Sequence, residues 1–224
     1  MGKGKLIVID GLDGSGKQTQ TKLLLEALSH TGQPVRQISF PTYGKSSALI
    51  ELYLSGAFGG RAGDVNPYAA STFFTVDRVA SYLGDWRADY EAGTLIVADR
   101  YTTSNAIHQA AKLSTEQKRA FFAWLDDFEY EKVKLPRPDA VFFLDLPPAL
   151  GQELMARRYS GDERKKDVHE RDLAYLEQCY ETAQLAAREL GWQRIECSGK
   201  GEIKSVQEIH LELVRRVKEI CDIL

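Results

Sequence analysis

The sequence predicts an α/β protein with a three-layer fold, in which helices cover both faces of a central five-stranded parallel sheet. Short apolar runs rich in Val, Ile and Phe are typical of buried parallel strands, and they occur at residues 5–10, 34–40, 94–99, 140–145 and 192–197. Between them lie longer segments with apolar residues at every third or fourth position, as in helices. Ligands of such a sheet bind at the carboxyl ends of its strands, so a site is expected there.

The helical segments carry recognisable ends. One apolar stripe runs from Leu173 to Leu190 and stops at Gly191, a residue that favours helix C-termini, and another begins at Val206. Ser114 and Gln117 have the spacing of a capping box, which predicts a helix start. A length of 224 residues is near the upper end for one domain, so we expect a single domain over residues 1–224.

The composition argues against several classes of function. The net charge is -3, so the chain lacks the positive excess with which proteins hold nucleic acids or anionic membranes. Its three cysteines form no CxxC pair, which argues against a zinc site or a disulfide framework and favours a reducing, cytoplasmic setting. The apolar run at residues 6–9 is too short for a signal peptide or a membrane span. Neither a nucleic acid nor a membrane is expected as a partner.

A glycine-rich loop follows the first strand and leads into a helix. It consists of Gly11, Leu12, Asp13, Gly14, Ser15, Gly16, Lys17, Gln18 and Thr19. Such a P-loop turns backbone N–H groups around a phosphate, and the helix N-terminus behind it adds favourable partial charge. Lys17 is expected to reach the outer phosphates of a nucleoside triphosphate. Gln18 replaces the usual Ser or Thr ligand of Mg²⁺, so direct binding and binding through water both stay open.

Three further segments carry candidate residues at or near strand ends. Asp99 and Arg100 end the third strand, where a carboxylate can orient Mg²⁺ and a guanidinium can hold an acceptor phosphate; an ordinary surface ion pair is the alternative. Phe40-Pro41 ends the second strand. Phe74 and Arg78 share a helical face and could stack a base and hydrogen-bond its edge; core packing plus a surface arginine is the alternative.

Taken together, these motifs resemble the thymidylate kinase family in order and spacing over essentially the full chain. The segments that carry the resemblance are residues 11–20, 40–41, 74–78 and 99–101, with Asp145 at the end of the fourth strand. The resemblance implies a P-loop kinase fold with a mobile lid, a homodimer, and transfer of the γ-phosphate of ATP to dTMP with Mg²⁺. Another nucleoside or nucleotide kinase, or an inactive ATP-binding regulator, is the alternative.

The resemblance also implies roles for individual residues. Phe74 would stack the thymine, Arg78 would bind its edge, Arg100 would hold the dTMP phosphate, Asp13 would lie near the sugar and acceptor phosphate, and Asp99 would organise Mg²⁺. Gln18, which departs from the motif, is the second candidate ligand of the ion. Phe40, Pro41, Asn105 and His108 would complete the dTMP site. His108 stands where relatives usually place Tyr or Phe against the sugar, and a structural histidine is the alternative.

A polar segment at residues 157–171 matches the position of the lid that closes over ATP in this type of kinase. The P-loop of some relatives carries an arginine where this chain has Gly14, so Lys17 is the only cation of the loop. Charge for the transition state must then come from elsewhere. We expect Arg157, Arg158 or Arg164 in the lid to supply it.

Overall fold

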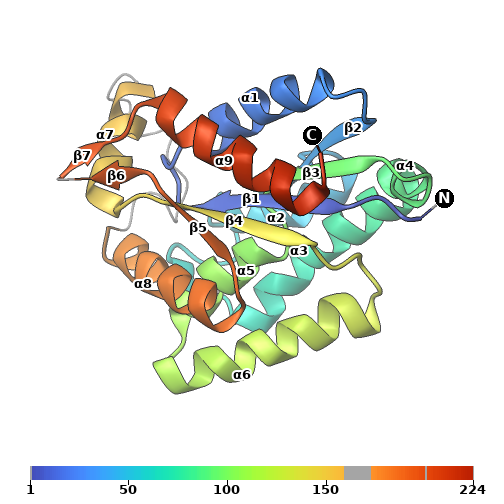
Figure 1. Ribbon diagram of the computed structural model, residues 1–224. Coiled ribbons are helices and arrows are strands. Elements are labelled where there is room, and N and C mark those ends of the chain that lie inside the picture. The colour runs from blue at the N-terminus through green and yellow to red at the C-terminus, as the bar shows by residue number, and fades with distance from the viewer. Residues whose placement is uncertain (1, 159–172, 200, 224) are drawn as a thin grey trace.

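The computed structural model describes residues 2–158, 173–199 and 201–223 (Figure 1). Five parallel strands form the central sheet, in the order β2-β3-β1-β4-β5. They are β1 (Leu6–Gly11), β2 (Val35–Ser39), β3 (Leu95–Asp99), β4 (Ala140–Asp145) and β5 (Gln193–Glu196). All five predicted strands are confirmed. Ile9 of β1 lies opposite Asp99 of β3, and Gly11 lies opposite Leu144 of β4, so the strand ends meet at one edge.

Helices cover both faces of the sheet, which confirms the three-layer prediction. They are α1 (Lys17–Ser29), α2 (Ala48–Leu54), α3 (Pro67–Ser81), α4 (Arg87–Glu91), α5 (Thr103–His108), α6 (Thr115–Asp126), α7 (Pro148–Arg158), α8 (Leu173–Glu189) and α9 (Val206–Cys221). In Figure 1, α1 and α9 lie above the sheet, and α5, α6 and α8 lie below it. Short helical segments lie between them at η1 (Lys45–Ser47), η2 (Ala62–Asp64), η3 (Tyr82–Trp86), η4 (Ala110–Lys112) and η5 (Asp127–Lys132).

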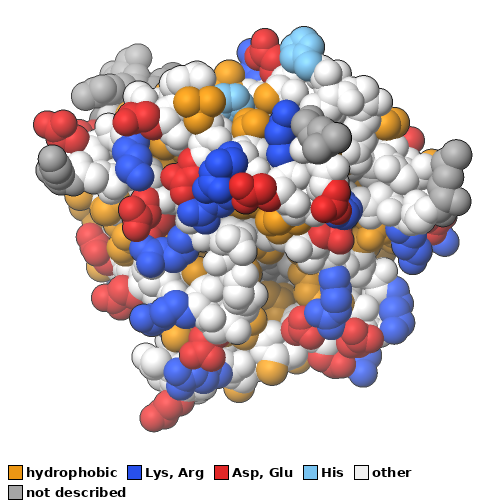
Figure 2. All heavy atoms as spheres, viewed as in Figure 1, with side chains coloured by type: hydrophobic (Ala, Val, Ile, Leu, Met, Phe, Trp, Pro, Cys, Tyr) orange, Lys and Arg blue, Asp and Glu red, His pale blue; other side chains and the backbone are white. Residues whose placement is uncertain are grey.

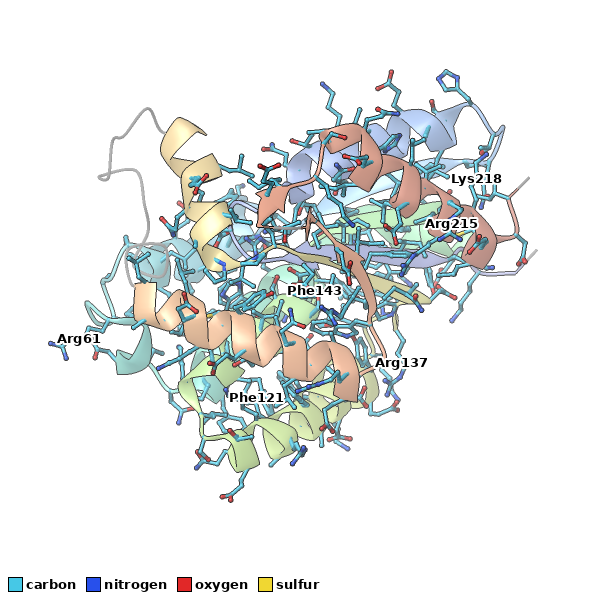
Figure 3. The ribbon with its side chains drawn as sticks, turned by 60° about the vertical axis from the view of Figure 1, so that its left-hand side comes forward. Arg61, Phe121, Arg137, Phe143, Arg215 and Lys218 are labelled. Carbon is cyan, nitrogen blue, oxygen red and sulfur yellow. The ribbon has the colours of Figure 1, made fainter. Side chains whose placement is uncertain are left out.

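The core has two apolar layers because successive strand residues point to opposite faces of a sheet. Ile7 and Ile9 of β1 belong to the layer under α1 and α9, and Leu6 and Val8 belong to the other layer. Figure 3 shows Phe143 of β4 in the interior of the molecule. The two layers fix the sheet against its helices, and the sheet edge carries the loops.

Local signals set the helix ends as the sequence predicts. The side chains of Ser114 and Gln117 each bind the other residue's backbone N–H at the start of α6, which is a complete capping box. Gly191 adopts a left-handed φ of 70° just beyond α8. A small antiparallel hairpin of β6 (Ser198–Gly199) and β7 (Glu202–Ile203) was not predicted from the sequence.

The surface carries both charges. On the face shown in Figure 2, Lys and Arg side chains are interspersed with Asp and Glu. Among the described helices, none has both the length and the apolar character that a membrane crossing requires.

Candidate functional site

A cleft of about 850 Å³ opens at the carboxyl end of the sheet. It brings together residues that are far apart in the sequence. Of the predicted site residues, its wall contains residues 13–19 of the loop together with Phe40, Pro41, Phe74, Arg78, Asp99, Arg100, Asn105 and His108. Gly11 and Leu12 are buried and do not line the cleft. The last two residues of α7 are Arg157 and Arg158, and Arg164 lies outside the described residues.

The glycine loop has the backbone geometry of an anion cradle. Gly14 and Gly16 both have left-handed φ angles, of 81° and 86°. Gly16 is the N-cap of α1 and provides no side-chain cap, which leaves the first N–H groups of the helix open to a ligand. The hydroxyl of Ser15 is buried and has no hydrogen-bond partner among the described residues. A bound phosphate would satisfy these groups.

Gly14 is required for the close approach of the loop to α7. A Cβ atom at this position would lie 2.3 Å from the carbonyl oxygen of Gly151, and the left-handed φ adds about 1 kcal/mol or more for any other residue. We expect Gly14→Ala to lower ATP affinity at least tenfold, measured by calorimetry with a non-hydrolysable analogue. Gly60→Ala is the control, because its Cβ would meet nothing within 4 Å. Unchanged affinity of Gly14→Ala would contradict the close approach.

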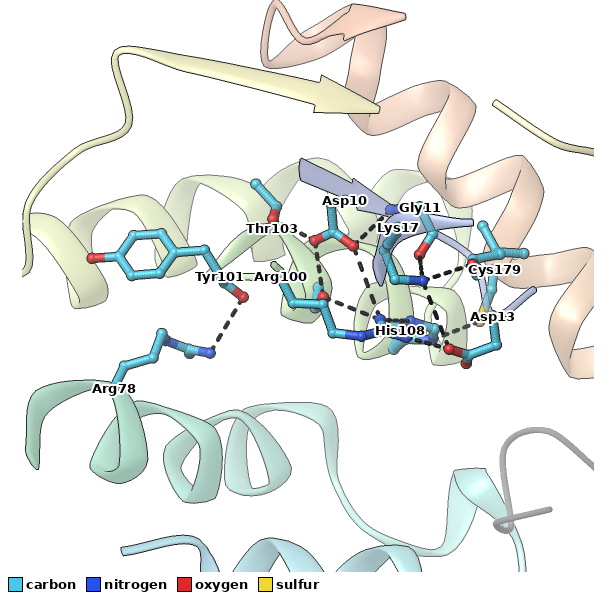
Figure 4. Close-up of polar contacts among 12 residues, drawn as sticks. Asp10, Gly11, Asp13, Lys17, Arg78, Arg100, Tyr101, Thr103, His108 and Cys179 are labelled. Carbon is cyan, nitrogen blue, oxygen red and sulfur yellow. Dashed lines mark hydrogen bonds and ion pairs between the residues drawn. The ribbon is translucent and has the colours of Figure 1, made fainter. Parts of the chain in front are cut away.

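Lys17 is buried, and its ammonium group turns toward the loop backbone. Its Nζ donates to the carbonyl oxygens of Gly11 at 2.8 Å and Leu12 at 2.7 Å, and lies 3.8 Å from the carboxylate of Asp13 (Figure 4). Burial and the neighbouring Arg100 lower the pKa of Lys17 to about 8, although nearby carboxylates oppose the shift. The positive charge of Lys17 is therefore poorly compensated within the protein. Anionic phosphates bound beside it would stabilise the protonated form.

This pKa predicts a pH dependence. Lys17 loses its proton as the pH rises through about 8, so kcat/KM for ATP, which reports the free enzyme, is expected to fall above that pH. At saturating ATP the bound phosphates hold the proton, so kcat should fall only at higher pH. Initial rates from pH 6 to 10 test both limbs. If kcat/KM for ATP stayed level up to pH 10, Lys17 would keep its charge without a ligand.

Arg100 links the P-loop to α5. Its backbone has a left-handed φ of 66° and its N–H donates to Ile9 O at 3.0 Å, which turns the side chain back over the strand ends. The guanidinium pairs with Asp13 and lies 3.4 Å from both Ser104 Oγ and His108 Nε2. Burial alone would lower the pKa of Arg100, but the surrounding carboxylates outweigh it and raise the pKa. Arg100 therefore stays charged, and it is positioned for an anionic ligand.

Asp10 belongs to this network and was not predicted from the sequence. Its buried carboxylate accepts hydrogen bonds from Gly11 N at 2.8 Å and Ser104 Oγ at 2.8 Å, and a third from Thr103 (Figure 4). It lies 3.9 Å from Arg100. Asp10 thus ties the first loop residue to the start of α5. The one available signal was a charged residue at the end of an otherwise apolar strand.

Asp99 and Gln18 are the residues predicted to hold Mg²⁺. Burial raises the pKa of the Asp99 carboxyl, which faces the cleft near Lys17 and Arg100. Gln18 is exposed at the mouth of the loop. Within the described ranges, no three His, Cys, Asp or Glu side chains gather as a metal site. A few neutral or anionic oxygen donors suit Mg²⁺, which usually keeps several waters and binds through substrate phosphates.

Arg78 and Phe74 are the residues of α3 that line the cleft. Arg78 is only 1% exposed, so the alternative of a surface arginine is wrong. Its guanidinium pairs with the buried carboxylate of Glu129. Phe74 is half-buried and meets the ring of Tyr53 edge-on, with centroids 6.1 Å apart.

The remaining predicted acceptor residues come from β2 and α5. Phe40 is buried, and its ring lies 5.8 Å from that of Tyr101. Asn105 donates to Ser71 O at 3.4 Å. His108 lies between Arg100 and the thiol of Cys179, with Nδ1 3.6 Å from Sγ.

Gln109 is a cleft residue that the sequence analysis missed. Its amide oxygen is buried and has no hydrogen-bond partner in the described part of the chain. Asp145, which helped to carry the resemblance, does not line the cleft; it binds Tyr180, Gln184 and Arg194 instead. Its position at a strand end therefore serves the junction of β4, β5 and α8.

Comparison with known proteins shows the family to which the chain belongs. The family model described as thymidylate kinase matches residues 9–209. The thymidylate kinase of Mycobacterium tuberculosis strain H37Rv is 33% identical over 84% of this chain and 87% of its own length. That of Plasmodium falciparum is 27% identical over 97% of this chain and 91% of its own length. A probable thymidylate kinase of Thermococcus kodakarensis is 35% identical over 63% of this chain and 66% of its own length. The chain belongs to the thymidylate kinase family.

Proposed function

We propose that this chain transfers the γ-phosphate of ATP to dTMP, giving dTDP and ADP. The observation that carries the proposal is the Arg100–Asp13 pair, which joins the phosphate-binding loop to the acceptor wall within one cleft. An oxygen of the dTMP phosphate attacks the γ-phosphorus as the bond to the β-phosphate oxygen of ATP breaks. The attacking oxygen is already anionic, so the reaction needs alignment and charge neutralisation rather than a general base.

On the acceptor side, Arg100 binds the dTMP phosphate and releases part of its hold on Asp13. Asp13 then lies beside the sugar and the acceptor phosphate. Phe74 stacks the base, Arg78 donates to its edge, and Phe40, Pro41, Asn105 and His108 enclose the nucleotide. The shared cleft wall supports these roles.

On the donor side, the loop N–H groups and Lys17 bind the ATP phosphates. Asp99 and Gln18 would hold Mg²⁺, directly or through water, and the ion would supply positive charge to the transferring phosphoryl group. The oxygen-rich donor set supports this assignment. Residues 157–171 act as a lid on one domain spanning residues 1–224, and Arg157, Arg158 or Arg164 supplies a further cation.

We further propose that the chain acts in the cytoplasm and that two copies form a homodimer. An apolar stripe on the exposed face of α3 and η3 supports a second copy as partner. It consists of Ala69, Val76, Ala80 and Leu83, with the polar Thr72 among them. Sedimentation would show a dimer, and Val76→Glu would convert it to a monomer.

The test of specificity is ADP release measured with a panel of monophosphates. We expect dTMP to be phosphorylated well above dGMP, dCMP and AMP, because the Phe74 and Arg78 wall suits one pyrimidine edge. Nucleosides in the same panel distinguish a nucleoside kinase. Turnover of AMP equal to that of dTMP would contradict the assignment of dTMP as the acceptor.

A further inference from the structure

Arg78 and Glu129 form an ion pair that is almost completely withdrawn from solvent. Their side chains are 1% and 0% exposed. Arg78 Nη2 bonds to one carboxylate oxygen of Glu129, and Arg78 Nε lies 3.4 Å from the other. This side-on arrangement uses both carboxylate oxygens, so it fixes the plane of the guanidinium as well as its position.

Glu129 reaches Arg78 from behind the cleft wall. It belongs to η5 (Asp127–Lys132), which follows α6, and it does not line the cleft itself. The hydroxyl of Thr75, one turn before Arg78 on α3, donates to Glu129 Oε1 at 2.7 Å. Glu129 is therefore held by the same helix whose arginine it orients.

The nitrogen atoms of Arg78 have different partners within the protein. Nε and Nη2 face Glu129, whereas Nη1 lies 3.4 Å from the carbonyl oxygen of Tyr101 (Figure 4). Arg78 also forms part of the cleft wall. A guanidinium is a donor at every nitrogen, so whatever part of it faces a ligand matches a carbonyl oxygen and opposes an amino group.

We propose that Glu129 is a positioning residue that holds Arg78 as a fixed donor and thereby makes the acceptor site select a pyrimidine with a carbonyl group at C4 over one with an amino group. This inference rests on the proposed function. Without Glu129, the guanidinium would lack a buried counter-charge and would turn toward other acceptors. Arg78 would then no longer discriminate between dTMP and dCMP.

The test variant is Glu129→Gln, which keeps the shape of the side chain but places an NH₂ group against the guanidinium. We expect the KM for dTMP to rise about tenfold and the preference in kcat/KM for dTMP over dCMP to fall about tenfold. The KM for ATP should not change. Glu131→Gln is the matched control, since Glu131 lies on the same segment and pairs with the exposed Arg137 at 2.9 Å.

Two further variants test the same contact independently. Thr75→Val removes the hydroxyl that donates to Glu129. It should raise the KM for dTMP and lower the preference for dTMP over dCMP, both less strongly than Glu129→Gln does. If Glu129→Gln fails to fold, unchanged values of both parameters in Thr75→Val would overturn the inference. In an Arg78→Met background, Glu129→Gln should have no further effect on the KM for dTMP. If the wild-type enzyme makes dTDP but Glu129→Gln keeps the wild-type preference for dTMP over dCMP, the role of Glu129 is wrong and the proposed function still stands. A wild-type enzyme that makes no dTDP would overturn the proposed function.

Discussion

Lys17→Met is expected to lower kcat by at least about 10³-fold, because the P-loop then has no cation to neutralise charge on the transferring phosphoryl group. In the unliganded structure the Lys17 ammonium is bound by the carbonyl oxygens of Gly11 and Leu12. When ATP binds, the phosphates replace these neutral acceptors with anionic ones. The enzyme thus holds the cation ready beside the position of the transferring group.

The variant is expected to stay folded, although Lys17 is a buried residue rather than a surface one. Methionine has a similar length, and burying it avoids the desolvation that lowers the pKa of Lys17. Circular dichroism and a thermal melt check the fold, and a coupled assay measures kcat. Lys22→Met, at an exposed position of α1, is the control. Activity of Lys17→Met comparable to the wild type would refute the P-loop assignment.

The second large effect concerns the proposed lid at residues 157–171, of which residues 159–171 lie outside the described residues. Among Arg157→Ala, Arg158→Ala and Arg164→Ala, one is expected to lower kcat at least about a hundredfold with a smaller change in the KM for ATP. Gly14 explains why: its close approach to Gly151 leaves no room for the arginine that some relatives carry in the P-loop. A cation must reach the phosphates from another segment.

Steady-state kinetics of the three variants decide between two roles of the lid. An arginine that stabilises charge only in the transition state changes kcat, whereas one that binds ATP in the ground state changes KM. Arg188→Ala, at an exposed position of α8, is the control. Near-normal kcat in all three variants would mean that the lid shields the site without supplying charge.

The fold and the phosphate loop could be predicted because their signals are local. Each strand is a short apolar run between polar segments, and the P-loop combines its glycines with a strand before and a helix after it. The capping box at Ser114 is equally local. These features depend on residues within a few positions of one another.

The supporting residues of the site could not be predicted because they depend on tertiary contacts. Glu129 is 51 positions from Arg78, and nothing in its neighbourhood distinguishes it from the other acidic residues of η5. The hydroxyl groups that make Asp10 part of the network lie 93 and 94 positions away, on Thr103 and Ser104. Sequence patterns located the residues that line the cleft better than those that hold them in place.

Arg78 shows how the contacts change an experiment. Truncating a surface arginine would change the stability of the protein little. Removing the Arg78 side chain, in contrast, would leave the Glu129 carboxylate buried and unpaired. Such a change costs about 3–5 kcal/mol of stability. Arg78→Met together with Glu129→Gln removes both charges and separates recognition of the base from folding.

The most direct test of phosphoryl transfer to dTMP is ³¹P NMR of the purified protein with ATP, Mg²⁺ and dTMP. We expect dTDP and ADP to appear in equal amounts, no inorganic phosphate to accumulate, and no product to form without dTMP. Release of inorganic phosphate at a rate independent of dTMP, or ATP binding with no dTDP formed, would contradict the proposed transfer.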